Sequence, residues 1–190
     1  MPEMHKIFGI PFDDISTNEM EVLFLKWLNG SHGKIIFTPN PEFILKARID
    51  SNFRNVLNQS DLSLADGVGI KFAITALTDK RLIHRQTGVD TLILLAEICA
   101  KENKKLVLLG GKNSVAQSAA DALKKQFQNL QVDSIDPGFV LGNSEAVSIP
   151  DDLISEIIRS SPNVLAVAFS FGKQERFILE ISKKITSLNI

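Results

Sequence analysis

The chain has 190 residues, of which 44% are hydrophobic and 23% are charged, which is typical of one globular domain with a sizeable core. Its formal net charge of −1 provides no global field for nucleic acid, and no apolar stretch approaches the roughly 20 residues needed to cross a bilayer. We therefore expect a single cytoplasmic domain over residues 1–190 with no nucleic-acid partner.

The first half of the chain alternates short apolar runs with helical patterns. Residues 7–12 predict an edge strand, because Pro11 cannot donate a hydrogen bond within a sheet. Ser16 and Glu19 have the spacing of a capping box, which predicts a helix from about Thr17 to Leu28. The elements predicted next are a buried strand at 34–37, a helix with Phe43, Ile44 and Ala47 inward, and a helix around Phe53, Val56 and Leu57. A strand at 62–65 and a helix over 67–77, with Ile70, Ala73, Ile74 and Leu77 on one face, complete this half.

The second half repeats this alternation. Residues 105–109 predict the clearest buried strand. Before it we expect a polar loop at 84–90 and an apolar helix at 90–100. After it we expect a helix from Ser114 that presents Val115, Ala119, Leu123 and Phe127, a strand at 131–135 and a turn at 136–139. The last predicted elements are a helix from Pro150 through Ile154, Ile157 and Ile158, a strand at 163–169, a helix at 173–185 and the beginning of a strand at 187–190. Alternating strands and helices predict an α/β fold, with a mostly parallel Rossmann-like sheet and helices on both faces.

Cys99 is the only cysteine, so the chain cannot form an internal disulfide. It lies in an apolar helical run. We interpret it as a small buried hydrophobe in a reducing compartment, in preference to a catalytic thiol.

Polar residues follow two of the predicted strands, where ligands bind in open α/β sheets. Asp66 can serve as a general base beside glycines that admit a ligand, or it can cap the helix that follows. Thr38 and Asn40 offer a hydroxyl and an amide that can orient sugar or phosphate hydroxyls. The alternative for both is turn chemistry around two prolines.

Three further positions suit a phosphate or a nucleotide. Arg85, in a Gly-containing loop, can neutralise a diphosphate or can be an ordinary surface arginine. Gly110 and Gly111 lie between a strand and a helix, where free backbone amides bind anions, although neither a dinucleotide fingerprint nor a Walker motif is present. Gln174 follows a buried strand and can reach a nucleotide, with helix capping as the alternative.

The sequence gives no support for a metal or another cofactor. No Asp-x-Asp pair occurs, and the three histidines lie far apart, without Cys or carboxylate at ligand spacing. We expect no cofactor, and the missing dinucleotide fingerprint argues against a nicotinamide-dependent oxidoreductase.

Taken together, these pieces resemble the WecG/TagA/CpsF family of bacterial glycosyltransferases. The motifs occur in order along nearly the whole chain: I-F-G-I-P-F-D at 7–13, T-P-N-P-E at 38–42, A-D-G-V-G at 65–69, R-Q-T-G-V-D at 85–90, L-L-G-G at 108–111 and K-Q-E at 173–175.

The resemblance implies an inverting, metal-independent transfer of a sugar from a UDP donor to a polyprenyl-diphosphate-linked sugar. In the best-known branch, N-acetylmannosamine moves to undecaprenyl-diphosphate N-acetylglucosamine, on the way to wall teichoic acid. By motif, Asp66 becomes the base that deprotonates the acceptor. Thr38 and Asn40 line the same pocket, and Arg85 and Gln174 lie near the donor.

Two departures from the family pattern qualify this expectation. The family usually has Gly-x-Pro before Lys-Gln-Glu, whereas this chain has Ser170-Phe171-Gly172. The family also continues with a basic C-terminal segment that resembles a membrane-docking appendage, which we expect to lie beyond Ile190. The full-length form would then be peripheral at the inner face of the cell membrane, and the 190-residue core weakly active or inactive. The alternative is a non-catalytic module that binds a nucleotide sugar.

Overall fold

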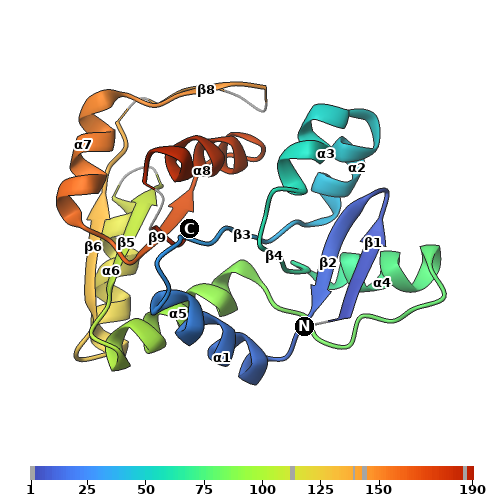
Figure 1. The fold of residues 1–190 in the computed structure, drawn as a ribbon, viewed down its shortest axis with the longest axis horizontal. Coiled ribbons are helices and arrows are strands. Elements are labelled where there is room, and N and C mark those ends of the chain that lie inside the picture. Colours follow the sequence, from blue (N-terminus) through green and yellow to red (C-terminus); the bar gives the residue numbers. More distant parts are fainter. Residues whose placement is uncertain (1–2, 112–113, 139, 143–144, 186–187) are drawn as a thin grey trace. The chain divides into compact units, whose positions relative to one another are not determined.

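The computed structural model describes residues 3–111, 114–138, 140–142, 145–185 and 188–190 (Figure 1). The chain divides into two compact units. Met1–Leu23 and Ile35–Thr91 form the first unit, and Phe24–Lys34 and Leu92–Ile190 form the second. The organisation as a single domain stays a prediction.

The first unit begins with a hairpin of β1 (Glu3–Ile7) and β2 (Ile10–Asp14), paired antiparallel. The turn has positive φ at both Phe8 (48°) and Gly9 (80°), as a two-residue hairpin turn of type I′ requires. The single edge strand predicted over 7–12 is therefore wrong. An aromatic residue rarely adopts positive φ, so Phe8 gave no signal for a turn.

A parallel pair of short strands, β3 (Ile36–Phe37) and β4 (Leu62–Ser63), follows in the same unit. Two helices connect these strands, α2 (Pro41–Ile49) and α3 (Ser51–Leu57). As predicted, their inward residues are buried, and the rings of Phe43 and Phe53 lie 5.7 Å apart. Helix α4 (Val68–Leu77) also belongs to this unit. Two helices continue from the first unit into the second, α1 (Thr17–Leu28), which begins with the predicted Ser16–Glu19 capping box, and α5 (Gly88–Lys101).

The second unit contains a three-stranded parallel sheet in the order β6-β5-β9. Its strands are β5 (Lys105–Gly110), β6 (Gln131–Ile135) and β9 (Val164–Ala168). The helices α6 (Val115–Gln126), α7 (Asp151–Ser160) and α8 (Lys173–Lys184) pack against these strands. The predicted α/β class, with a parallel sheet surrounded by helices, is confirmed.

Some local predictions for this unit fail. Val115 and Ile158, expected to face inward, are 57% and 53% exposed. The antiparallel pair β7 (Leu141–Gly142) and β8 (Val147–Ser148) was not predicted. Of the strand expected at 187–190, the described part runs parallel to β9 through an Asn189–Val164 bridge, and Ser187 lies outside the described residues.

Within the described part of the chain, no helix has the length and apolar character needed to cross a membrane.

Candidate functional site

The carboxyl ends of β3 and β4 bring Thr38 and Asp66 to Gly88, the first residue of α5. Beyond the strands, the amide of Asp66 donates to the carbonyl of Pro39 at 3.1 Å, so the two strand ends leave the sheet together. A β-carbon placed on Gly88 would lie 3.2 Å from Thr38 Oγ1 and 3.9 Å from Asp66 Oδ2. The ends of the two strands therefore converge within the first unit.

The carboxylate of Asp66 makes no structural contact of its own among the described residues. The N-cap of α4 is Gly67, with φ 89°, and no side chain caps this helix. Across the ranges that the structure describes, the half-buried side chain of Asp66 has no hydrogen bond or ion pair. The helix-cap interpretation of Asp66 is wrong, and the role as a base stays a prediction.

Asn40, by contrast, has a local structural task. Its Oδ1 accepts hydrogen bonds from the amides of Glu42 at 2.9 Å and Phe43 at 3.4 Å, which caps α2. The turn interpretation of Asn40 is confirmed. Only its Nδ2 group remains for a ligand, so a role in substrate binding stays a prediction for Asn40, as it does for Thr38.

A second glycine explains part of the A-D-G-V-G motif. A β-carbon on Gly69 would lie 2.6 Å from Cγ of Pro41, inside van der Waals contact. Glycine at this position lets the first turns of α2 and α4 approach each other closely. The two segments that carry Asn40 and Asp66 are thereby packed side by side.

Arg85 lies in a loop that is anchored on both sides of it. His84 is bound by Asp14, and the buried side chain of Gln86 donates from Nε2 to Thr17 Oγ1 at 3.2 Å. Arg85 itself is exposed and, among the described residues, has no hydrogen bond or ion pair. Both the diphosphate and the surface-residue interpretations remain predictions.

Two aspartates at the end of β2 were missed in the sequence. Asp13 Oδ2 accepts from the amide of Ser63 at 2.8 Å, and burial raises the pKa of Asp13. Asp14 accepts from the amides of Ile83 at 2.7 Å and His84 at 2.8 Å. Burial acts to raise the pKa of Asp14, but these amides and the imidazole of His84 together lower it. The pair of adjacent carboxylates at the end of a strand was the sequence signal that could have identified these two residues.

In the second unit, Gly110 and Gly111 lie against the end of β9. Gly110 has φ 112°, and a β-carbon there would lie 2.4 Å from the carbonyl oxygen of Ala168. The amide of Gly111, with φ 76°, donates to that oxygen at 3.1 Å. The glycines thus permit close approach of two strand ends. Residues 112–113 lie outside the described residues, and phosphate binding stays a prediction.

Gln174 and Glu175 fix the turn between β9 and α8. Oε1 of Gln174 accepts a hydrogen bond from the amide of Phe169 at 3.2 Å, so one polar atom of this side chain is used within the turn. A contact between Gln174 and a nucleotide stays a prediction. Glu175 reaches back to cap α8, because its Oε2 accepts from the amide of Gly172 at 3.0 Å. Glu175 is 2% exposed, and burial raises its pKa to about 7 despite these hydrogen bonds. Sequence reasoning missed this carboxylate, although it belongs to the K-Q-E motif.

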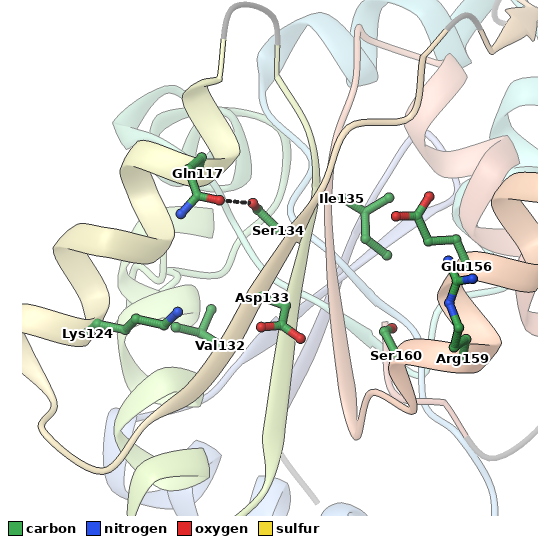
Figure 2. A pocket seen from close by; sticks show the side chains of 9 residues that line it. All are labelled: Gln117, Lys124, Val132, Asp133, Ser134, Ile135, Glu156, Arg159 and Ser160. Carbon is green, nitrogen blue, oxygen red and sulfur yellow. Dashed lines mark hydrogen bonds between the residues drawn. The ribbon is translucent and has the colours of Figure 1, made fainter.

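A cavity of about 330 Å³ lies elsewhere in this unit, along the outer edge of β6 (Figure 2). Figure 2 shows Gln117 and Lys124 of α6 on one side of the strand, and Glu156, Arg159 and Ser160 of α7 on the other. None of the predicted site residues lines it. It follows the side of a strand, whereas ligands in α/β sheets bind at strand ends, so we assign it to the sheet edge.

Comparisons with known proteins confirm the family resemblance. The model of the glycosyl transferase WecG/TagA/CpsF family matches residues 5–190. The chain is 27% identical over 173 residues to the N-acetylglucosaminyldiphosphoundecaprenol N-acetyl-beta-D-mannosaminyltransferase of Bacillus subtilis (strain 168), covering 90% of this chain and 64% of that protein.

Proteins of the same name from two other bacteria are similar. The chain is 25% identical to that of Bacillus spizizenii (strain ATCC 23059 / NRRL B-14472 / W23), covering 87% of this chain and 62% of the relative. The chain is 27% identical to the protein of Staphylococcus aureus (strain NCTC 8325 / PS 47), covering 91% of this chain and 66% of the relative. The chain thus spans less than two thirds of the length of these relatives.

Proposed function

Because the chain belongs to the WecG/TagA/CpsF family of glycosyl transferases, we propose that it transfers N-acetylmannosamine from a UDP donor to undecaprenyl-diphosphate-linked N-acetylglucosamine, with inversion. The names of the relatives specify this sugar and this acceptor for those proteins. The product would enter wall teichoic acid or a related surface polysaccharide. The reaction would take place at the inner face of the cell membrane, where a lipid-linked acceptor is held.

The observation that supports this proposal most directly is the carboxylate of Asp66, which has no partner among the described residues and lies beside Thr38 and Gly88. Asp66 removes the proton from the attacking acceptor hydroxyl. The acceptor oxygen then bonds to the anomeric carbon as the bond from that carbon to the UDP oxygen breaks, and UDP leaves with the electron pair. Thr38 and the Nδ2 group of Asn40 orient the hydroxyls of the sugar.

The leaving diphosphate requires positive potential. Arg85 provides a guanidinium that matches phosphate oxygens with paired donors. Gly110 and Gly111, which precede α6, contribute a second anion site, and Gln174 contributes a contact to the nucleotide. With these groups in place the transfer needs no metal ion. We expect turnover to persist in EDTA.

The test is Asp66→Asn, measured with UDP-N-acetylmannosamine and a short-chain lipid diphosphate acceptor. Loss of a general base should lower turnover by about 10²–10⁴-fold. The affinity for UDP, measured by calorimetry, should not change. Asp79→Asn is the matched control, because Asp79 is an exposed carboxylate in the same unit.

The assay is run on this chain and on a version extended by the C-terminal segment of a relative, which we expect to raise turnover. Wild-type turnover in Asp66→Asn would disprove the role of the base. UDP binding without turnover in either version would instead support a non-catalytic nucleotide-sugar-binding module.

A further inference from the structure

Four large apolar side chains are exposed around the Asp66 site. They are Val68 (56% exposed), Phe72 (73%), Ile83 (69%) and Val89 (67%), and we call them the apolar patch. Single exposed apolar residues are ordinary, but a group of them beside a site marks a surface for a partner.

Helix α4 brings three of these residues together. Val68 and Phe72 are four residues apart and share one face of α4, whereas Ile70 and Ile74 on the other face are fully buried. The ammonium of Lys71 donates to the carbonyl of Ile83 at 3.2 Å, which holds the loop alongside α4.

Val89 adjoins the same site from α5. It follows Gly88, whose added β-carbon would lie 3.9 Å from Asp66 Oδ2, and Val68 comes two residues after Asp66. The patch therefore borders the candidate base from two helices.

The same segment carries a local excess of positive charge. Residues 68–89 contain four cations (Lys71, Lys80, Arg81 and Arg85) and one carboxylate (Asp79), and with the flanking Asp66 and Asp90 the net charge over residues 66–90 is +1, in a chain with a net charge of −1. Lys80 pairs with Glu3 at 2.8 Å. Arg81 and Arg85 are exposed and have no ion pair within the described ranges.

We propose that the apolar patch and these cations form a surface that docks on an anionic lipid bilayer. Apolar side chains enter the boundary between headgroups and acyl chains, and flanking Lys and Arg residues bind anionic headgroups. An acidic membrane complements both properties of the surface. A second copy of the chain would bring like charges together.

This inference rests on the proposed function, because docking on a membrane matters to an enzyme whose acceptor is linked to a lipid. An undecaprenol-linked acceptor presents its sugar just above the headgroups. A bilayer bound at Val68 and Phe72 holds Asp66 at that level, so the core takes part in positioning itself on the membrane.

The test is co-sedimentation of the 190-residue chain with vesicles of phosphatidylcholine, with or without phosphatidylglycerol. We expect binding to the anionic vesicles, at least about tenfold weaker binding to the neutral ones, and weakening by salt. Phe72→Ser and Arg81→Gln should each reduce binding by about three- to tenfold. Ile158→Ser, on α7, removes an equally apolar exposed side chain outside the patch and should bind as the native chain does.

Equal binding by the native chain and Phe72→Ser would overturn the inference, as would no binding to anionic vesicles. A dimer in sedimentation velocity that Phe72→Ser dissociates, with no vesicle binding, would assign the patch to a second copy and also overturn it. Turnover on a soluble short-chain acceptor should be unchanged in Phe72→Ser. That assay tests the proposed function separately, since it requires no membrane.

Discussion

Asp14 Oδ1 accepts two hydrogen bonds from His84, one from its amide at 2.8 Å and one from its imidazole Nδ1 at 2.9 Å, across 70 residues of sequence. The other oxygen accepts from Ile83 at 2.7 Å and lies 3.6 Å from Nε2 of His5, which is buried. One carboxylate at the end of the hairpin thus fixes the loop immediately before Arg85.

We expect Asp14→Asn to loosen this loop, because an amide cannot accept from three donors at once. The free energy of unfolding should fall by about 1–3 kcal/mol. Hydrogen exchange at the amides of Ile83 and His84 should accelerate, and the loss of turnover should exceed that of Asp79→Asn in the same loop. Unchanged exchange at both amides would contradict this prediction.

The lowered pKa of Asp14 makes the stability of the fold depend on pH in a definite direction. A carboxyl whose pKa is lower in the folded state stabilises the fold above its ordinary value of 3.8, and this stabilisation is lost as pH falls through the folded-state pKa. The difference in stability between the native chain and Asp14→Asn should therefore shrink in acid.

Gly88→Ala should separate activity from stability. The added methyl group would lie 3.2 Å from Thr38 Oγ1 and 3.9 Å from Asp66 Oδ2 and would occupy the space between them, so turnover should fall by about tenfold to a hundredfold. Stability should change by less than about 1 kcal/mol, because alanine favours the helix that begins there. Val89→Ala in the same turn is the control, assayed with a soluble acceptor. Native turnover in Gly88→Ala would show that substrate does not use the space between Thr38 and Asp66.

Glu175→Gln should alter the pH dependence of stability. Burial raises the pKa of Glu175 to about 7 from an ordinary 4.5, so the folded state binds the additional proton between these values. The contribution of Glu175 to the free energy of unfolding is therefore largest below pH 4.5. This contribution falls by on the order of 2 kcal/mol as the pH rises toward 7.

Glutamine keeps an oxygen that can accept from the amide of Gly172, and it has no charge to bury. Urea titrations at several pH values should show that the difference between Glu175→Gln and the native chain grows in favour of the variant from pH 4.5 to 7. A constant difference over this range would contradict the prediction.

Cys99 should be inert in the native protein. The thiol is buried, and burial raises its pKa to about 12, although Lys104 acts in the opposite direction. Only the thiolate reacts readily, so labelling with a disulfide reagent should follow the rate of unfolding. In denaturing urea it should be complete within the mixing time. Rapid labelling without urea would contradict this expectation.

Local and short-range features were the ones that sequence predicted well. The Ser16–Glu19 capping box depends on residues three apart, and the strand at 105–109 is apolar along its length, so both are present. The family resemblance implied one pocket for Thr38 and Asp66, and the ends of β3 and β4 bring both residues to Gly88.

Features that depend on distant partners were missed. Asp14 looks like any carboxylate at the end of a strand until His84 reaches it, and Gly67, not Asp66, is the N-cap of α4, where its φ of 89° suits glycine. The exposure of Val115 and Ile158 shows the same limit, since helical spacing indicates which residues share a face but not how far the neighbouring strands extend to cover it.

The outer edge of β6 has a consequence for behaviour at high concentration. Among the described strands β6 pairs only with β5, and an unpaired strand edge can recruit strands from other chains. Here Asp133 is exposed on β6 and pairs with Lys105 of the neighbouring β5 at 2.6 Å, and charged side chains on an edge strand oppose the addition of another strand. The edge is thereby protected against intermolecular β-pairing, and Asp133→Val should make the protein prone to aggregate without changing its fold.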